Sequence, residues 1–298
     1  MDKKICSMVA DRIVSALDAG VVPWRKPWVG GYQLATSYVT RKPYSLINQI
    51  LLGNPSEYIS FKQVKDLGGR VKKGAKASKV VFWNILNYDA DGKLIKNVPE
   101  AEKNGVKVVK TVPYLKEWSV FNVADCEGIK PHEDEPLPNN AVKNLGAEKI
   151  INDYLTRENI EMHRDDLSAQ AFYRLNDDSI TVPRIDQFNE TAEYYSTVFH
   201  ECVHSTGKQG RLDRFATDDA AQASFGSDSY SREELVAEIG AACMVNALGL
   251  ETEGSFQNSA AYLKHWRDKI AEDNSLIIVA AGRAEKAFNF ILDGKKGE

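Results

Sequence analysis

The stretch His200-Glu201-Cys202-Val203-His204 constrains this chain more than any other part of its sequence. On a helix, residues four apart lie on one face, one turn above each other, so both imidazoles can point at one metal ion. Glu201 would lie about 100° further round the helix, beside the metal. From there it can take a proton from a metal-bound water, which is the layout of a zinc peptidase. The alternative is a helix that carries two histidines by chance.

The residues before the motif predict a helix and a strand that would support such a site. Residues 190–199 have the apolar and aromatic pattern of a helix, with Asn189 or Thr191 as its N-cap. Residues 179–183 read as a short strand, and Pro183 at its end fits best on the edge of a sheet. An edge strand beside an active-site helix could hold an extended peptide by main-chain hydrogen bonds.

A catalytic zinc usually has three protein ligands and one open position for water. Glu233, Glu234 and Glu238 are the candidates for the third ligand. The pattern E-x-x-A-E at residues 234–238 resembles the E-x-x-A-D of peptidases whose third ligand is a glutamate. That resemblance implies that Glu234 binds the metal and that Glu238 supports a histidine from behind. The alternatives are a capping box between Ser231 and Glu234, and a solvated helix face for the other two glutamates.

Length and composition limit the class of protein. With 298 residues, 43% of them hydrophobic, the chain is long enough for two domains with a core. It has no run of about 18 apolar residues, so we expect no membrane span. Residues 1–17 mix charges into an amphipathic pattern and lack the apolar stretch of a secretory signal. The four cysteines are scattered without a C-x-x-C pair, which favours the reducing cytoplasm.

Charge divides the chain into two unlike halves. Residues 1–130 hold 21 Lys and Arg against 12 Asp and Glu, whereas residues 131–298 hold 17 against 30. A basic half favours a polyanionic partner, and the acidic half with the metal motif does not. We predict an α+β protein with a basic α+β domain at 1–130, a polar and proline-rich linker at 131–140, and a mostly helical domain around a small sheet at 141–298. Residues 216–231 could form a flap beside the metal.

Basic and aromatic residues alternate in the first half. Residues 62–79 contain seven Lys or Arg and a single acid, Asp66, and two tryptophans lie in a proline-rich loop at 21–28. Such a surface suits single-stranded DNA, because cations follow the phosphates while unpaired bases stack on the rings. The alternative is a solvated lysine-rich face. The residues that we predict to bind DNA are Trp24, Arg25, Lys26, Trp28, Lys42, Tyr44, Arg70, Lys72, Lys73 and Lys76.

Several motifs together resemble the ArdC-type antirestriction proteins, over nearly the whole chain. The likeness to their N-terminal domain rests on Val22-Pro23-Trp24-Arg25-Lys26-Pro27-Trp28, Lys42-Pro43-Tyr44-Ser45-Leu46-Ile47-Asn48 and Gly68-Gly69-Arg70-Val71-Lys72-Lys73-Gly74. The likeness to their zincin-like metallopeptidase domain rests on Ile180-Thr181-Val182-Pro183, on the H-E-x-x-H motif, and on Glu233-Glu234-Leu235-Val236-Ala237-Glu238. Two residues depart from the family pattern: Cys202 stands where we expect Leu, and Ser205 where we expect an aromatic residue.

The resemblance implies a plasmid- or phage-borne protein that binds single-stranded DNA and protects incoming plasmid DNA from host restriction during conjugation. It also implies a zinc metallopeptidase with His200, His204 and Glu234 as ligands and Glu201 as general base, although manganese or nickel could occupy such a site. Its peptide substrate would be a restriction-related or DNA-bound protein. Two other interpretations are a protective DNA-binding module with a structural or vestigial metal site, and an accessory protein of replication or of a primase.

Overall fold

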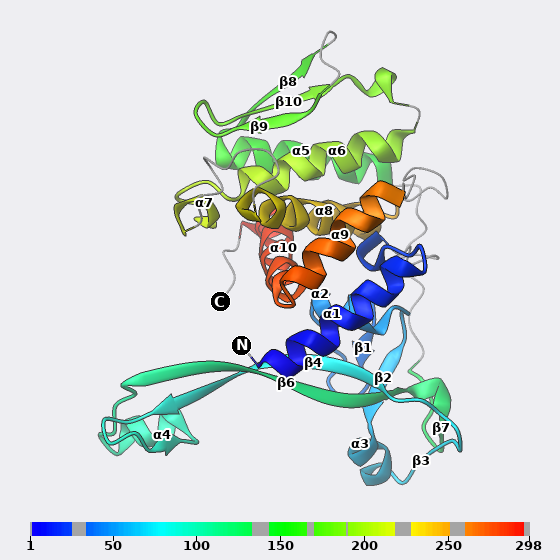
Figure 1. Ribbon diagram of the computed structural model, residues 1–298, viewed down its shortest axis with the longest axis vertical. Helices are drawn as coiled ribbons and strands as arrows, with labels where there is room; N and C mark the ends of the chain where they lie inside the picture. The colour runs from blue at the N-terminus through cyan, green and yellow to red at the C-terminus, as the bar shows by residue number, and fades with distance from the viewer. Residues whose placement is uncertain are drawn as a thin grey trace.

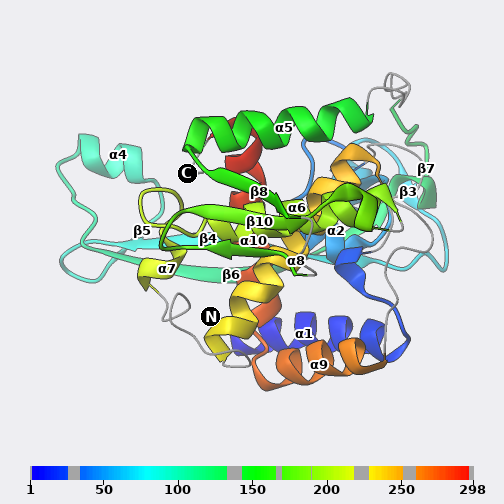
Figure 2. The same ribbon diagram turned by 90° about the horizontal axis from the view of Figure 1, so that it is seen from above.

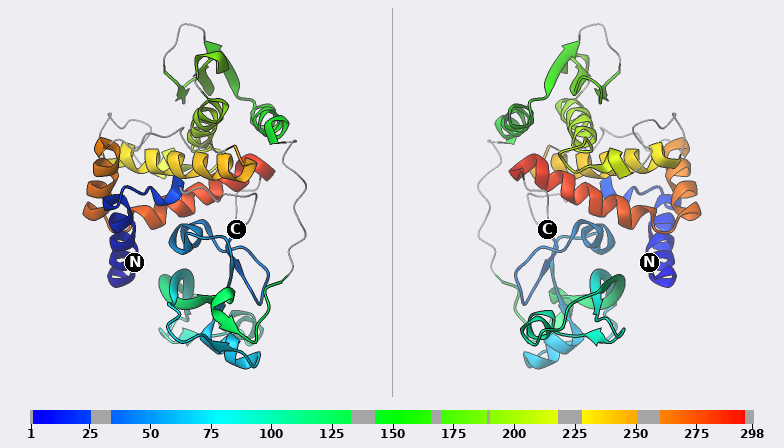
Figure 3. Two further views of the ribbon diagram at one scale, coloured as in Figure 1. Left: turned by 90° about the vertical axis from the view of Figure 1, so that its right-hand side faces the viewer. Right: turned by 90° about the vertical axis from the view of Figure 1, so that its left-hand side faces the viewer.

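The computed structural model describes residues 2–25, 34–132, 143–165, 170–188, 190–217, 228–250 and 260–294. In these residues the helices and strands stack in layers along the longest axis of the molecule (Figure 1). A small sheet covers two helices at one end, a layer of long helices follows, and a larger sheet lies at the other end (Figure 3). The predicted α+β class is confirmed.

The first half of the chain builds the larger sheet. Its helices are α1 (Lys3–Asp18), η1 (Pro23–Arg25), α2 (Leu46–Leu52), α3 (Phe61–Asp66), α4 (Val98–Lys103) and η2 (Val123–Asp125). Its strands are β1 (Thr36–Ser37), β2 (Glu57–Ser60), β3 (Arg70–Val71), β4 (Ser78–Tyr88), β5 (Leu94–Ile95), β6 (Lys110–Asn122) and β7 (Cys126–Glu127). The sheet has the order β1-β2-β6-β4-β5, while β3 and β7 pair separately. Strands β4 and β6 form a long antiparallel ribbon, paired from Ser78↔Val120 to Tyr88↔Lys110, with β5 and α4 in the connection between them; we call this ribbon the hairpin.

Helix α1 shows how local sequence sets an element. The Asp2 side chain caps its start by accepting a hydrogen bond from the backbone N–H of Lys4 at 2.9 Å. Buried residues then recur at helical spacing from Ile5 to Leu17, which gives the helix one apolar face. After the helix, Gly20 adopts a positive φ of 78°, a conformation that glycine reaches at little cost. The chain can therefore turn directly after the helix.

The second half supplies the small sheet and most helices. Its helices are α5 (Lys143–Glu158), η4 (Ile185–Gln187), α6 (Thr191–Ser205), α7 (Arg214–Thr217), α8 (Asp228–Leu248), α9 (Ala260–Glu272) and α10 (Leu276–Asp293). Its strands are β8 (Glu161–Asp165), β9 (Phe172–Arg174) and β10 (Ser179–Pro183). Helices α8 and α10 lie in one layer below α5 and α6, and α8 packs against both α6 and α10 (Figure 3).

The expectation that residues 179–183 form an edge strand is wrong. The sheet order is β8-β10-β9, so β10 is the central strand, parallel to β8 and antiparallel to β9. Proline is tolerated there because β9 pairs only with Ser179, Ile180 and Thr181. At Pro183 the strand has only β8 beside it, so the missing N–H breaks no ladder on the β9 side. The edge strand nearest the metal helix is therefore β9.

One hydrophobic core crosses the two halves of the sequence. Buried residues of α1 and α2 belong to the same cluster as those of α6, α8 and α10. Seen from above, α1 lies alongside α9 on one flank, opposite α5 (Figure 2). The indole of Trp24 is 1% exposed and packs edge to face against Trp266 of α9, with ring centroids 6.3 Å apart. Residues 2–25 therefore complete a helical layer built from the other end of the chain.

The domain division stays a prediction, because the shared core crosses it and most of the expected linker at 131–140 lies outside the described residues. Most of the expected flap at 216–231 lies outside them as well, since the description breaks between 217 and 228. Within the described ranges, no helix combines the length and the apolar character needed to cross a membrane.

Candidate metal centre

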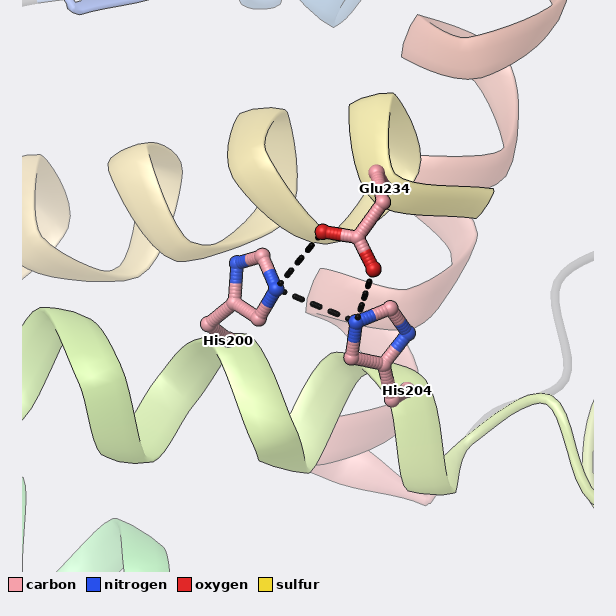
Figure 4. A group of neighbouring side chains, drawn as sticks. All are labelled: His200, His204 and Glu234. Carbon is pink, nitrogen blue, oxygen red and sulfur yellow. Dashed lines mark hydrogen bonds and ion pairs between the residues drawn. The ribbon is translucent and has the colours of Figure 1, made fainter. Parts of the chain in front are cut away.

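Helix α6 turns the two histidines of the motif toward α8. The residues Val198, Phe199 and Cys202 are fully buried in the core. His200 and His204, four residues apart, share another face, where they meet a glutamate from the first turns of α8 (Figure 4). Cys202 is a packing residue, as its place on the helix suggested. Its burial also raises the pKa of its thiol far above the ordinary value, so the thiol stays protonated and unreactive.

The three predicted ligands converge. The Nε2 atoms of His200 and His204 are 3.0 Å apart. The two carboxylate oxygens of Glu234 lie 3.4 Å from these nitrogens, one oxygen facing each histidine. Atoms bound tetrahedrally to a zinc ion at about 2.0–2.1 Å would lie roughly 3.3 Å from one another. The group therefore has the spacing of a divalent-metal site, with ligand atoms within 4.8 Å of one another.

A second carboxylate supports His204 from behind, and it belongs to Glu233. Its Oε1 lies 3.4 Å from Nδ1 of His204, the ring nitrogen that faces away from the ligand group. Glu233 is itself held by the Arg214 guanidinium through hydrogen bonds of 2.6 and 3.0 Å. Arg214 also donates to the Val203 carbonyl and the Thr206 hydroxyl, which ties the carboxylate to the end of α6. A carboxylate behind a ligating histidine fixes the orientation of its ring.

Glu238, the residue expected to support a histidine, accepts a hydrogen bond from the Tyr262 hydroxyl at 3.2 Å. Its assignment to a histidine stays a prediction, and the support role that the contacts show belongs to Glu233. The sequence held one signal for this: Glu233 and Glu234 are adjacent and therefore point about 100° apart on a helix. Which of them faced the metal and which faced Arg214 depends on how α8 packs on α6.

The electrostatics of the group favour cation binding. Burial by itself lowers the pKa of His204, but the hydrogen bonds that its ring donates to Glu233 and Glu234 outweigh burial and raise that pKa to about 10. Burial would raise the pKa of Glu233, yet the charge of Arg214 and the hydrogen bond with His204 bring it down to about 2. The pKa of Glu234 falls below its usual range because both histidines face it, although burial opposes this. The site concentrates negative charge around two imidazoles.

The ligand group opens into a cleft that also contains Glu201. The cleft has a volume of about 320 Å³ and is lined by the three ligands, Glu201, Glu233, Phe215, and residues 171–173 and 175. Glu201 is only 6% exposed, and it is one of the residues that line the cleft. One wall belongs to β9, the edge strand of the small sheet. Metal ligands, a neighbouring carboxylate and a strand edge therefore surround one space.

The predicted DNA-binding residues divide into several groups. Trp24 is buried against Trp266, so its ring cannot stack on a base, and its expected role is replaced by a structural one. Lys26, Trp28 and the side chain of Arg25 lie outside the described residues. Lys42 is exposed, whereas Tyr44 is half-buried and lines a second cavity.

The basic residues around β3 are exposed, and two of them also bind the protein itself. Arg70 pairs with Glu127 across the β3–β7 ladder. The Lys72 ammonium donates to the Ala124 carbonyl at 2.7 Å. Lys73 and Lys76 are exposed next to them. The predicted cationic surface therefore exists at residues 70–76, and part of its charge is balanced locally.

Exposed aromatic rings lie on the β4–β6 hairpin, where the sequence analysis did not place DNA contacts. The side chains of Phe82 and Trp118 are 40% and 47% exposed. Phe82 is paired with Lys116 across the ladder, and the Lys116 ammonium lies 4.3 Å from the centre of the Trp118 ring. Residues paired across a ladder share a face, so we call these three residues the aromatic face of the hairpin. Strand aromatics usually belong to a core, which is why sequence alone could not reveal their exposure.

Comparison with known proteins agrees with this architecture. Residues 3–121 match the family described as the N-terminal domain of anti-restriction factor ArdC. Residues 149–283 match the family described as zincin-like metallopeptidase. Crystal structures of the antirestriction ArdC protein from the R388 plasmid, one metal-free and one Mn(II)-bound, are similar to this chain, with a TM-score of 0.68 and 30% sequence identity. The similarity covers 98% of this chain and 97% of the R388 protein.

Similar sequences also occur inside larger proteins. Two DNA primase TraC proteins of Escherichia coli are 32% identical over 97% of this chain. The chain spans only 27% and 20% of their lengths. Protein y4eC of Sinorhizobium fredii (strain NBRC 101917 / NGR234) is 26% identical, over 95% of this chain and 89% of that protein. With the two family matches and the likeness to the R388 protein along nearly its whole length, the chain belongs to the ArdC family of antirestriction proteins.

Proposed function

We propose that this protein is a metal-dependent peptidase that acts on a protein held near single-stranded DNA, and that it thereby protects incoming plasmid DNA during conjugation. One observation carries the proposal: His200, His204 and Glu234 gather in a cleft beside Glu201 and under a strand edge. A purely structural metal would need neither the open cleft nor a neighbouring carboxylate.

The chemistry of the donor set fits a divalent cation, and we propose zinc. A bound divalent cation would polarise a peptide carbonyl and make a water more acidic. The residues of the chain do the rest. Glu201, one residue after the first histidine, accepts the proton of the attacking water and passes it to the leaving amine. Manganese is a second candidate, since the similar R388 protein has a Mn(II)-bound structure.

The substrate segment would bind in an extended conformation along β9. That strand is the edge of the small sheet, so its outer N–H and C=O groups can pair with a peptide main chain. The cleft beside it is lined by Phe172 and Phe215, which offer apolar contact to a substrate side chain. We therefore propose a peptide with an apolar residue next to the cleaved bond.

For single-stranded DNA we propose two contact regions in the first half of the chain. The exposed lysines at 73 and 76 attract the phosphates, and the aromatic face of the hairpin stacks on unpaired bases. Affinity should be higher for a single strand than for a duplex of equal length, and should fall steeply with salt. Binding to the same DNA would raise the local concentration of a protein substrate.

The decisive experiment compares the proteins of cells during DNA transfer, with wild-type protein against Glu201→Ala. Cleavage of the substrate should be lost in the variant, while metal content and DNA affinity stay unchanged. Glu193→Ala, in the first turn of the same helix, is the matched control and should cleave normally. Equal cleavage by wild type and Glu201→Ala would sink the peptidase proposal.

The primase relatives favour a second candidate function. Segments similar to this chain occupy a minor part of two primases, so the chain could instead accompany replication of the incoming strand, as a DNA-binding protein whose metal site is structural or vestigial. Protection from restriction in cells separates the two functions. Full protection by Glu201→Ala would favour the DNA-binding role, and loss of protection would favour peptide cleavage.

A further inference from the structure

A second cavity lies away from the metal, where the two halves of the chain meet. It has a volume of about 200 Å³ and lies between α2, the last turns of α8 and α10. A cavity of about 150 Å³ in another protein holds a benzene ring, so this one can take a single flat heterocycle. Its walls are mainly apolar, with the rings of Tyr44 and Phe288 among them.

Two polar groups in this cavity have unused hydrogen-bonding capacity. The Nδ2 atom of Asn246 is buried and has no partner among the residues that the structure describes. Leaving a buried donor unpaired costs about 1–3 kcal/mol. The carboxylate of Glu285 accepts one backbone N–H, from Leu46 at 3.3 Å, and pairs with no cation in the described part of the chain. The Glu285 carboxylate thus offers an acceptor at the cavity wall, and rotation of the Asn246 side-chain amide would bring its unpaired N–H donor into the cavity.

The wall around these groups is fixed in advance. The Gln49 side-chain amide accepts a hydrogen bond from the Ala35 N–H and donates to the Ala35 and Tyr44 carbonyls, at 2.8–2.9 Å. Asn48 makes two hydrogen bonds to the backbone of Val81. Helix α2 is therefore tied to the loop before it and to the large sheet, and the Tyr44 ring keeps its place without a ligand.

The surroundings indicate where such a ligand comes from. The Tyr44 ring lies 6.1 Å, centroid to centroid, from Phe82, which belongs to the aromatic face of the hairpin. Trp118 lies diagonally across the ladder from Phe82 on the same face, so exposed rings continue from the cavity wall along the sheet. Lys42, two residues before Tyr44, is exposed and can meet a phosphate. Rings in a row beside a cation are what a single strand of nucleic acid uses.

We propose that this cavity binds one unpaired nucleobase, inserted from a single strand that runs along the aromatic face. The base would lie against Tyr44 and Phe288, accept a hydrogen bond from Asn246 and donate one to Glu285. Every nucleobase carries a donor and an acceptor on its edge, and a carboxylate can accept from an exocyclic amino group or from a ring N–H such as the N3–H of thymine. The inference rests on the proposed binding of single-stranded DNA, and it names a base contact that phosphate binding alone would not require.

The test measures whether the cavity senses the base rather than the backbone. Binding of labelled oligothymidylate is compared with binding of an abasic strand of equal length, for wild type and Asn246→Leu. The variant should weaken binding of the thymidine strand about tenfold, the effect of one buried hydrogen bond. Binding of the abasic strand should not change. An equal change for both strands, or no change for either, would overturn the proposal, and the second result would mean that a water satisfies Asn246.

Two further variants keep the test decisive. Asn152→Leu makes the same substitution on the exposed side of α5 and should change neither affinity. If Asn246→Leu fails to fold, Glu285→Gln keeps the side-chain volume and should also weaken only the thymidine strand. Retained metal binding shows that α8 is intact in each variant, because this helix carries both Glu234 and Asn246.

The source of the base is decided separately. If wild-type protein binds no single strand, the DNA part of the proposed function fails, and thymidine monophosphate is then titrated into wild type and Asn246→Leu. Binding that the variant abolishes would keep the cavity as a nucleobase site filled by a free nucleotide. Absence of binding to both strand and nucleotide would overturn the cavity proposal as well.

Discussion

At the scale of single residues, the metal centre depends on a carboxylate that is not a ligand. Glu233 connects the His204 ring to Arg214, and all three groups are largely buried. Removing the carboxylate would leave the guanidinium without its charged partner and the ring without its support. Mutating a residue that supports a metal ligand from behind typically lowers metal affinity 10–100-fold. Substitutions at Glu233 are therefore as informative as substitutions of the ligands themselves.

We therefore predict that Glu233→Gln weakens metal binding by about 10–100-fold, whereas Glu238→Gln has a smaller effect. The two substitutions are chemically identical and lie on the same helix, so they serve as controls for each other. Competition with a fluorescent chelator would measure both affinities. A larger loss in Glu238→Gln would return the supporting role to the residue that the family pattern suggested.

This part of the site shows the limit of sequence reasoning. The two histidines followed from their spacing, because a helix brings residues four apart together whatever the rest of the fold does. Glu234 could be separated from Glu233 and Glu238 only by resemblance, since all three lie on one predicted helix. The partner of Glu233, Arg214, is 19 residues away at the start of the short helix α7, and no local pattern connects them.

Proton release on metal binding gives a pH prediction. In the metal-free protein the pKa of His204 is raised to about 10, mainly because the hydrogen bonds that its ring donates to Glu233 and Glu234 outweigh burial. The charged ring thus stabilises the metal-free fold fully below about pH 6.5, and this contribution is lost as pH rises toward 10. A metal ligand must be the neutral imidazole, so the cation has to displace this proton.

We expect metal affinity to rise between pH 6 and 9, with about one proton released from His204 for each cation bound. Titration calorimetry in buffers of different ionisation enthalpy would count the protons. His204→Ala removes the titrating group together with a ligand, so its residual weak binding should release fewer protons. A wild-type affinity that does not change with pH would contradict the raised pKa.

At the scale of elements, the close contact of α6 and α8 sets the distance between the histidines and Glu234. A methyl group added at Gly240 of α8 would lie 2.7 Å from a methyl carbon of Val203, in the middle of the H-E-x-x-H motif. Only glycine allows the two helices to come this close. The spacing of the metal ligands therefore depends on a residue that binds nothing.

Gly240→Ala should destabilise the protein by about 1–3 kcal/mol through overpacking and should weaken metal binding, because α8 must move away from α6. Gly282→Ala on α10 is the matched control. A methyl group there meets no described atom within 4 Å, so replacing a helical glycine should stabilise by about 0.5–1 kcal/mol. Denaturant unfolding of both variants would show whether the free energy of unfolding falls in Gly240→Ala and rises in Gly282→Ala. A neutral Gly240→Ala would mean that the helices separate without cost.

Element pairing was the least predictable level. The strand at 179–183 was recognised from its composition, but its place in the sheet was not. The strands that pair with it, β8 and β9, have five and three residues, too few for a strong pattern of their own, while β9 and β10 also contact α6 further along the chain. The substrate edge consequently moved from β10 to β9, while the metal helix stayed as expected.

At the scale of the whole molecule, the charge division predicts that the first half binds a polyanion, and this stays a prediction, whereas the core shared by the two halves could not be seen in the sequence. Trp24 and Trp266 are 242 positions apart, and no local pattern in the sequence connects them. Their contact joins η1 (Pro23–Arg25) to α9, so this part of the loop packs on a helix from the other end of the chain. Trp24, although it lies beside the basic residues of the proline-rich loop, is therefore a structural residue. The exposed rings, Phe82 and Trp118, lie on the β4–β6 hairpin.

Two tryptophan variants test this exchange of roles. Trp24→Ala should lower stability by about 3–5 kcal/mol, the usual cost of removing a large buried aromatic residue. Any loss of DNA binding should then follow the fraction of unfolded protein. Trp118→Ala, on the exposed face of the hairpin, should leave the unfolding free energy within about 0.5 kcal/mol of wild type. It should weaken binding of a single strand by about 1–3 kcal/mol, because one stacking platform is gone.

Thermal melting and fluorescence anisotropy on the same samples would separate the two effects. Anisotropy has to be read at a temperature where both variants are folded, since otherwise Trp24→Ala would imitate a DNA-binding defect. If folded Trp24→Ala lost affinity and Trp118→Ala did not, the strand would run along the proline-rich loop instead of the hairpin. In that case the strand would not pass Trp118 and Phe82. This comparison therefore also decides whether a base can reach the cavity at Asn246 from the aromatic face of the hairpin.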